Sequence, residues 1–336
     1  MKKIINLHLR KRVLESTSIE KYFEEIVKVM RSVGSDVQIV TAPYPTTGLL
    51  NKILLLRYMV KFRSQLNHIG GDFHFLALSL IGTRYVLSVM DLVFMREKPT
   101  LIRLIFAIFW IYLPIKFSFK TVVISESVKK EIVELFPSLS SKLLVIPCCI
   151  HDDYFKTDSL LCSTGDQLQK QVLIIGTGPT KNLERMILAL KDVDVKVAIV
   201  GTLKKHHKRL LDDNNILYEN FVGIVRSEVI RLYKQSDLLL FVSEYEGFGL
   251  PIVEAQACGL PVVTSNIYSM PEVAGGAALI ADPYKINQIK MALCDLLTNV
   301  SKRENLVKNG KLNAKRFTST EIVKQWWNVY ANFENY

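Results

Sequence analysis

Two glutamates eight residues apart, Glu246 and Glu254, enclose the segment of this chain that is best suited to chemistry. Between them lie Gly247, Gly249 and Pro251. Glycine lets the backbone approach a ligand closely, and proline is typical of the first turn of a helix. A carboxylate accepts hydrogen bonds from neighbouring hydroxyl groups, and the free N–H groups at a helix start attract phosphate. The spacing therefore predicts a site for a ligand that carries both hydroxyl groups and phosphate.

Apolar runs predict the elements that position these glutamates. Residues 238–242 form an uninterrupted apolar run that is typical of a buried parallel strand, and a helix is expected to start near Pro251 and to end at Gly259. Glu246 then lies in the strand-to-helix loop, and Glu254 lies one turn into the helix. In open α/β sheets, ligands bind at such loops beyond the carboxyl ends of the strands.

The rest of the chain shows the same alternation. In the second half, the expected strands are 172–176, 195–200, 238–242 and 261–265. The expected helices are 183–190 and 228–235, and the chain from Tyr284 to its end is expected to be helical. In the first half, a helical stripe over 19–30 precedes expected strands at 37–41, 72–75, 85–89, 121–124 and 143–146. This pattern predicts an α/β fold of two Rossmann-like, doubly wound domains that face a cleft and are joined near residues 147–170.

Residues 244–259 resemble the E-x7-E signature of family 4 glycosyltransferases, and the resemblance continues through residues 259–265 and 271–275. Members of this family are retaining enzymes with the two-domain GT-B fold. The resemblance implies that residues 1–150 form the acceptor domain and that residues 151–317 form the nucleotide-sugar donor domain. It also implies that the last helix, within residues 318–336, crosses back to pack on the first domain.

The resemblance assigns donor contacts to the loop around the two glutamates. Glu254 would accept hydrogen bonds from the ribose hydroxyls, and Glu246 would contact the transferred sugar. Gly247 leads into three backbone N–H groups that would face the distal phosphate or the sugar, those of Phe248, Gly249 and Leu250.

A second loop, residues 176–185, resembles the phosphate-contacting segment of the family. Gly176 and Gly178 turn the chain there, and Lys181 stands at the start of the next expected helix. Negative charge develops on the leaving diphosphate as the glycosidic bond breaks, so a lysine at this point would stabilise it. Family members often have an arginine a few residues before this lysine that also contacts the diphosphate, and it is absent here. Arg185 is a weaker candidate for that second cation.

The acceptor side is expected in the first domain, where His74 and Asp91 lie at the ends of expected strands. Family members commonly carry a histidine just before this aspartate, and the present chain has Met90 in that place. His74 or Asp91 would then orient the acceptor or handle its proton. A purely structural role is the alternative for His74.

The composition is consistent with an anionic ligand and a reducing compartment. The 336 residues carry a net charge of +11, which favours nucleoside diphosphates, anionic lipid surfaces or nucleic acid, but no nucleic-acid motif is present. Five cysteines without metal-finger spacing argue against a disulfide framework. The apolar stretch at the N-terminus is too short for a signal peptide, so we expect a cytoplasmic protein.

We expect neither a cofactor nor a metal, because Lys181 and helix N-termini would supply the positive charge that the diphosphate needs. Asp192 and Asp194 have the D-x-D spacing of metal-dependent sugar transferases. They fall between an expected helix and an expected strand, at the wrong edge of the sheet, and are interpreted as a polar turn. His206 and His207 are interpreted as part of a solvated helix face.

The sequence thus predicts a retaining, metal-independent glycosyltransferase that uses a UDP- or GDP-sugar. Its acceptor would be a glycan or a polyprenyl-linked sugar in the synthesis of O-antigen, capsule or exopolysaccharide. Two alternatives stay open. The replacement of the usual histidine by Met90 leaves open a non-catalytic nucleotide-sugar-binding subunit of a glycan-synthesis complex. Nucleotide-sugar epimerases share the GT-B architecture but are not expected to carry the E-x7-E segment.

An apolar run at residues 104–115 predicts a membrane contact. It carries four aromatic residues and is flanked by five basic ones, Arg96, Lys98, Arg103, Lys116 and Lys120. The run is shorter than the about 20 apolar residues that a membrane-spanning helix needs. A helix of this kind docks at a membrane interface or is buried in the core. The positive charge favours peripheral attachment to the inner face of the membrane.

Overall fold

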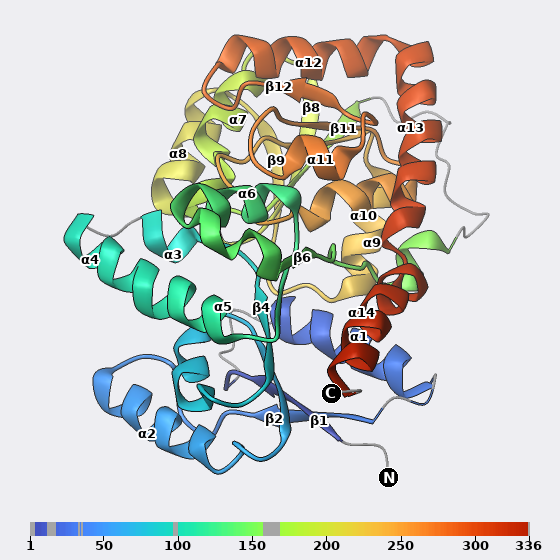
Figure 1. Cartoon of the computed structure of the whole chain (residues 1–336). Coiled ribbons are helices and arrows are strands. Elements are labelled where there is room, and N and C mark those ends of the chain that lie inside the picture. The colour runs from blue at the N-terminus through green and yellow to red at the C-terminus, as the bar shows by residue number, and fades with distance from the viewer. Residues whose placement is uncertain are drawn as a thin grey trace. The chain divides into compact units, whose positions relative to one another are not determined.

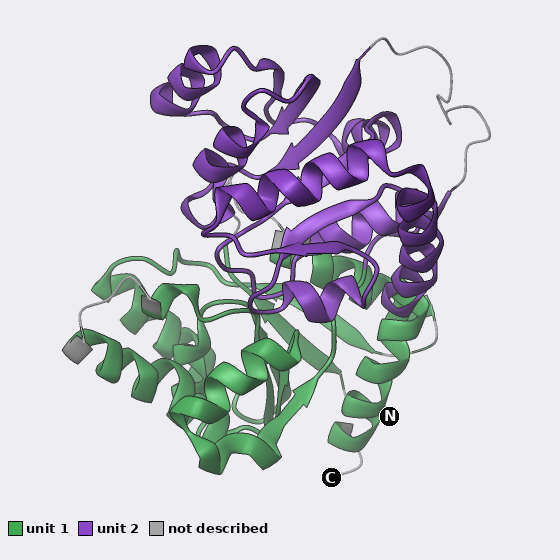
Figure 2. Ribbon diagram, turned by 90° about the horizontal axis from the view of Figure 1, so that it is seen from above, with its two compact units in different colours: residues 1–149, 318–336 green, residues 150–317 purple. Residues whose placement is uncertain are grey.

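The computed structural model describes residues 4–11, 18–32, 34, 36–96, 100–156 and 169–334. Within these ranges, two six-stranded parallel sheets alternate with helices (Figure 1). The chain divides into two compact units, one made of residues 1–149 and 318–336 and the other made of residues 150–317 (Figure 2). The α/β class with two doubly wound sheets is confirmed.

The sheet of unit 1 has the strand order β2-β1-β3-β4-β5-β6. Its inner strands β1 and β4 are buried along their whole length, as expected of a parallel sheet covered on both faces. The strands are β1 (Ile5–Leu9), β2 (Val37–Thr41), β3 (Leu66–Gly70), β4 (Tyr85–Val89), β5 (Lys120–Val123) and β6 (Leu143–Val145). The helices are α1 (Ser18–Ser32), α2 (Leu49–Val60), η1 (His74–Leu80), α3 (Val93–Arg96), α4 (Thr100–Phe106), η2 (Ala107–Tyr112), α5 (Leu113–Phe117), α6 (Glu126–Leu135), η3 (Pro137–Lys142) and α14 (Ser319–Glu334).

The sheet of unit 2 has the order β12-β11-β10-β7-β8-β9. Its strands are β7 (Lys170–Ile175), β8 (Val195–Val200), β9 (Leu217–Phe221), β10 (Leu238–Phe241), β11 (Val262–Ser265) and β12 (Leu279–Ala281). The helices are η4 (Asp152–Phe155), η5 (Pro179–Lys181), α7 (Leu183–Leu190), α8 (Lys205–Asp213), α9 (Arg226–Gln235), α10 (Leu250–Cys258), α11 (Met270–Ala274), α12 (Ile286–Thr298), α13 (Val300–Ala314) and η6 (Lys315–Phe317).

The strand order of unit 2 reverses between β7 and β10. The chain runs outward from β7 to β9 and then returns to β10 on the other side of β7. The loops that follow β7 and β10 therefore leave the carboxyl edge of the sheet in opposite directions. Such a reversal is where open α/β sheets have room for a ligand.

The strand expected at residues 72–75 is wrong. The strand is β3, which ends at Gly70, and Gly71 has a φ of 117°, so the chain turns there before the 3₁₀ helix η1. The sequence of β3 contains Asn67 and His68, both fully buried, which hides it from a search for apolar runs. Their side chains are satisfied by hydrogen bonds, because Asn67 contacts His8 at 2.8 Å and His68 contacts the hydroxyl of Ser88 at 2.8 Å.

The last helix, α14, belongs to unit 1 and packs against α1. Trp326 is buried, and its indole N–H donates a 2.9 Å hydrogen bond to the hydroxyl of Tyr22 on α1. The neighbouring Trp327 is exposed to 38%. One tryptophan of the pair therefore anchors the helix, while the other lies at the surface.

Candidate functional site

The loop between β10 and α10 has a fixed shape. Gly249 has a φ of 103°, in the left-handed region, and a Cβ there would approach the side chain of Ile252 to 3.1 Å. The hydroxyl of the buried Ser269 lies 2.9 Å from the carbonyl oxygen of Glu246 and 2.7 Å from that of Phe248. Helix α10 then begins at Leu250, as expected from the proline that follows it.

Lys181 lies beyond the carboxyl end of the neighbouring strand, β7. Gly176 has a φ of 92°, and a Cβ on it would come within 3.0 Å of Cε of Lys181, so the lysine side chain lies across this glycine. Gly178 then precedes the 3₁₀ helix η5 that carries Lys181. Nζ of Lys181 donates a 2.6 Å hydrogen bond to Oε1 of Glu246, and the two side chains are 25% and 13% exposed. Two residues predicted from separate loops therefore form one partly exposed ion pair.

Asn182 joins the two loops, and the sequence analysis missed it. Its φ of 58° is left-handed, a conformation that asparagine tolerates better than most residues. Its buried side-chain amide donates to the carbonyl oxygens of Val242 at 2.9 Å and Pro283 at 2.8 Å. The backbone N–H of Glu244 also donates to the carbonyl of Thr180 at 2.8 Å. The available signal was an asparagine immediately before a helix.

Arg185, in the first turn of α7, lies close to Asn182 and is bound by neighbouring side chains. Its guanidinium donates to the carboxylate of Glu244 and to Oδ1 of Asn182, the latter at 2.9 Å. It also lies 5.3 Å from the ring centroid of Tyr284. The Arg185 side chain is 38% exposed and that of Lys181 is 25% exposed, and each of these cations is paired with a carboxylate.

Glu254 is held by tyrosines that the sequence analysis did not single out. The hydroxyl of Tyr233, on α9, donates a 2.8 Å hydrogen bond to Oε2 of Glu254, and Tyr154 supplies a second hydroxyl. Burial raises the pKa of Glu254 above its ordinary value, and the two hydrogen bonds oppose this shift. No sequence spacing links these tyrosines to Glu254, because they come from η4 and α9.

The two candidates in unit 1 occupy different surroundings. His74 is buried at the start of η1, and burial lowers its pKa to about 4 although the charge of Asp72 opposes the shift, so the ring is neutral at pH 7. Neither ring nitrogen makes a well-oriented hydrogen bond to the described residues, although backbone groups of Gly71 and Ser88 lie close enough to affect the pKa. The carboxylate of Asp91 accepts a 3.0 Å hydrogen bond from the backbone N–H of Val93 at the start of α3.

The aspartates with D-x-D spacing lie away from Lys181. Asp192 has a left-handed φ of 60°, and Oδ1 of Asp194 accepts a 2.6 Å hydrogen bond from Gln169. Both lie in the turn between α7 and β8, which is at the amino edge of the sheet. Their positions fit the interpretation as a polar turn.

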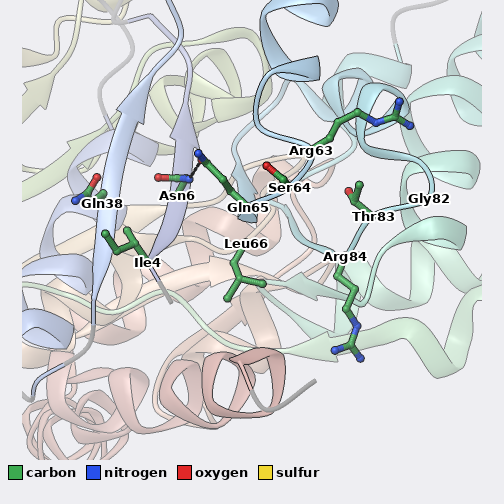
Figure 3. Close-up of a pocket in the computed structure, with 10 residues that line it drawn as sticks. All are labelled: Ile4, Asn6, Gln38, Arg63, Ser64, Gln65, Leu66, Gly82, Thr83 and Arg84. Atoms are coloured by element: carbon green, nitrogen blue, oxygen red, sulfur yellow. Dashed lines mark hydrogen bonds between the residues drawn. The ribbon is translucent and has the colours of Figure 1, made fainter. Parts of the chain in front are cut away.

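A pocket of about 770 Å³ lies in unit 1 (Figure 3). It is lined by residues at or before the starts of β1, β3 and β4, together with Gln38 and Arg63. Asn6 and Gln65, joined by a 2.6 Å hydrogen bond, form part of its wall. The pocket is thus at the amino edge of the sheet and contains none of the predicted site residues.

Part of unit 2 is similar in sequence to known glycosyltransferases. Residues 166–313 match the family model of glycosyl transferases group 1, which is less than half of the chain. The O-antigen chain mannosyltransferase B of Escherichia coli is 30% identical over 225 residues, which cover 62% of this chain and 59% of that protein. The chain thus spans less than two thirds of this curated relative.

Two solved structures show the fold. The sucrose-phosphate synthase of Thermosynechococcus elongatus superposes with a TM-score of 0.81 at 16% identity, covering 98% of this chain and 99% of that one. HepE of Anabaena, solved in complex with UDP and glucose, gives a TM-score of 0.75 at 16% identity, covering 98% of this chain and 100% of that one. The present chain has the GT-B fold. Within it, residues 166–313 are the part that is similar to group 1 glycosyltransferases.

Proposed function

We propose that this chain is a retaining glycosyltransferase of family 4 that transfers a hexosyl or related group from a nucleoside diphosphate sugar to a glycan. The observation that carries the proposal is the pairing of Lys181 with Glu246 at the reversal of strand order between β7 and β10. A cation and a carboxylate at such a point suit a ligand that has a diphosphate at one end and a sugar at the other. The match of residues 166–313 to group 1 glycosyl transferases supports it.

Each site residue would contact a different part of the donor. Lys181 and the N–H groups at the start of α10 would stabilise the charge that develops on the leaving diphosphate. Glu246, freed from Lys181 by the incoming phosphate, would accept hydrogen bonds from the sugar hydroxyls. Glu254, oriented by Tyr233, would accept from the ribose. These groups need no metal ion to perform these roles.

In unit 1, His74 and Asp91 would orient the acceptor hydroxyl. A buried imidazole with a lowered pKa is neutral at pH 7 and is able to accept a hydrogen bond from a hydroxyl group. Met90 is nearly buried beside Asp91 and offers the sugar no polar contact. The similarity to an O-antigen mannosyltransferase supports a surface polysaccharide as the product and mannose as the first sugar to test.

The acceptor would be lipid-linked and reached from an anionic membrane surface. In the apolar run, Ala107, Ile111 and Ile115 are buried, whereas Leu104 and Phe109 are 56% and 44% exposed. The run therefore has one face in the core and one at the surface. Lys98, one of its basic flanks, lies outside the described residues.

Helix α2 adds to this exposed face. Nζ of Lys52 lies 5.0 Å from the ring centroid of Trp110, which makes α2 and η2 neighbours, and Leu49 and Leu50 of α2 are 77% and 70% exposed. None of the helices within the described ranges combines the length and apolar character that crossing a bilayer requires. Exposed apolar groups beside basic residues instead suit docking at an interface.

Flotation with liposomes tests the membrane contact. Phe109→Glu should lower binding to anionic vesicles at least several-fold, because it places a charge where an apolar ring would enter the interface. Met291→Glu is the matched control, since Met291 is 72% exposed on α12 of unit 2. Equal flotation of both variants, or none by the wild type at low salt, would leave the acceptor soluble.

A panel of UDP- and GDP-sugars tests the activity itself. A donor that binds only the native state raises the melting temperature, by an amount equivalent to about 2.7 kcal/mol at one hundred times its Kd. A glycosyltransferase consumes that donor when a glycan acceptor is added. Binding without turnover would instead indicate a non-catalytic subunit, and conversion of the donor sugar without an acceptor would indicate an epimerase.

A further inference from the structure

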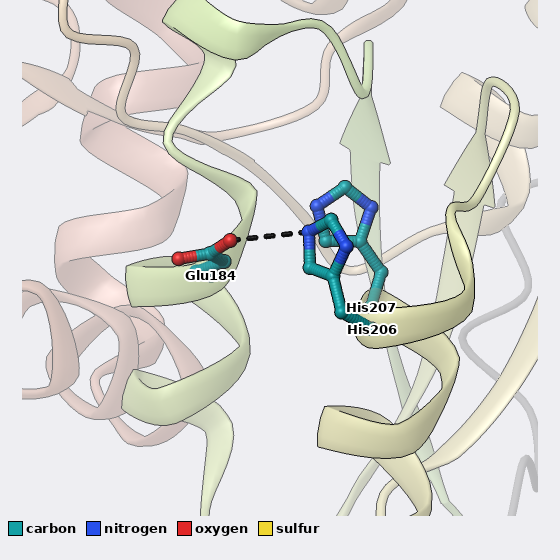
Figure 4. A group of neighbouring side chains, drawn as sticks. All are labelled: Glu184, His206 and His207. Carbon is teal, nitrogen blue, oxygen red and sulfur yellow. Dashed lines mark ion pairs between the residues drawn. The ribbon is translucent and has the colours of Figure 1, made fainter.

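Three potential metal ligands meet on the surface of unit 2, apart from the ion pair of Lys181 (Figure 4). Glu184 comes from the first turn of α7, and His206 and His207 come from the first turn of α8. Nε2 of His206 lies 3.2 Å from Oε1 of Glu184, and the two imidazole ring centroids are 4.0 Å apart. One ligand atom from each residue lies within 4.8 Å of the others.

Part of this spacing matches that of a bound ion, because Glu184 and His206 are 3.2 Å apart, whereas the three ligand atoms together are separated by up to 4.8 Å. Ligands placed about 2.0 to 2.1 Å from a tetrahedral zinc ion lie about 3.3 Å from one another. Glu184 and His206 are 62% and 54% exposed, so their side chains are free to move the remaining distance by small rotations. His207 is 5% exposed, so the interpretation of both histidines as part of a solvated helix face is wrong for His207, whose ring is held in place by its burial.

The donor set selects the class of metal. Two imidazoles and one carboxylate suit zinc and related transition metals, whereas magnesium and calcium prefer oxygen ligands throughout. Nδ1 of His207 accepts a hydrogen bond of 3.4 Å from the backbone of Lys204, which is long and is therefore lost at little cost.

We propose that Glu184, His206 and His207 form a surface site for Zn²⁺. Three protein ligands leave at least one coordination position for water or an anion. An ion pair between His206 and Glu184 explains this arrangement less well than a metal site does. Ion pairs between exposed side chains contribute little to stability, and they do not require a second imidazole beside them. The site is at the carboxyl edge of the sheet, and it does not depend on the proposed transferase activity.

Zinc titration of the full chain, purified without a histidine tag and first freed of metal, tests the site. His206→Asn and Glu184→Gln should each lower the affinity for Zn²⁺ at least about tenfold, since even indirect partners of metal ligands contribute that much. Both side chains are exposed, so both variants should fold like the wild type. His151→Asn is the matched control, because His151 pairs with Asp153 at 2.9 Å.

Cobalt substitution identifies the ligand atoms. The Co²⁺ form should show the spectrum of nitrogen and oxygen ligands, without the charge-transfer band of a thiolate, which distinguishes this site from binding at Cys258 or Cys294. Absence of Zn²⁺ binding at micromolar concentration would overturn the proposal. So would equal affinity in the wild type and both variants, or a thiolate band.

Discussion

Replacing Lys181 with alanine should weaken the binding of a nucleoside diphosphate by roughly 2 to 4 kcal/mol, or about 30-fold to 1,000-fold in Kd. The magnitude follows from the ion pair with Glu246. At 2.6 Å, two unit charges attract by roughly 1.6 kcal/mol in water and by roughly 6 kcal/mol at an effective dielectric constant of 20. Desolvation offsets part of this attraction, and a phosphate in the place of the carboxylate would gain a comparable net amount.

Glu246→Gln should have the opposite effect on the nucleotide. The neutral amide releases Lys181 for the diphosphate, so the affinity should be equal to that of the wild type or tighter by up to about 1 kcal/mol, the scale of a partly exposed ion pair. Turnover should fall, because Glu246 is the group proposed to hold the sugar. The double variant should bind the nucleotide as weakly as Lys181→Ala alone.

Calorimetry with UDP and GDP measures these affinities, and melting temperatures verify that each variant folds. Lys196→Ala is the matched control, since Lys196 pairs with Glu219 at the same 2.6 Å on the same sheet and should leave binding unchanged. Unchanged affinity in Lys181→Ala would place the diphosphate elsewhere. Equal weakening by Glu246→Gln would mean that the pair is a structural link between two loops.

Four further outcomes are expected. Glu254→Ala should weaken nucleotide binding by roughly 2 to 4 kcal/mol by calorimetry. Burial raises the pKa of Glu254 above its ordinary value of 4.5, so the stability of the wild type falls as pH rises from 4.5 through the raised pKa. Glu254→Gln does not titrate and should therefore gain stability relative to the wild type between pH 4 and pH 7 in thermal melts. A constant difference in stability between the two proteins would contradict this. Gly176 and Gly276 both have a left-handed φ, so Gly176→Ala and the control Gly276→Ala should each lose about 1 to 2 kcal/mol of stability. Only Gly176→Ala should also lose donor affinity, because its Cβ would meet the side chain of Lys181. Transfer should persist in excess EDTA, and a loss restored by Mg²⁺ or Mn²⁺ would revive a metal at the diphosphate.

Local patterns in the sequence predict most of the strands. The apolar run at residues 85–89 coincides with β4, because a strand buried on both faces must be largely apolar. The strand expected at residues 37–41 coincides with β2, which lies at the edge of the sheet and is only partly buried. The same rule misses β3, whose buried Asn67 and His68 are polar, and it misses β9, an edge strand with mostly exposed residues. Hydrogen-bond partners from other strands, which no local pattern reveals, make such sequences stable.

The two loops of the candidate site can each be predicted from the sequence, but the contact between them cannot. Glu246 and Lys181 each follow an expected strand, yet they are 65 residues apart, and only the strand order places β7 beside β10. Tyr233 reaches Glu254 in the same way, from a helix 21 residues away. The identity of groups at a sheet edge can therefore be predicted from sequence, whereas their pairing depends on topology.

The location of a bound nucleoside diphosphate sugar tests the central claim most directly. In a crystal structure of the chain soaked with the donor that gives the largest thermal shift, we expect the diphosphate within hydrogen-bonding distance of Nζ of Lys181 and the ribose hydroxyls at the carboxylate of Glu254. Density for the donor at any other place, such as the pocket at the amino edge of the unit 1 sheet, with Lys181 still bound to Glu246, would contradict the account.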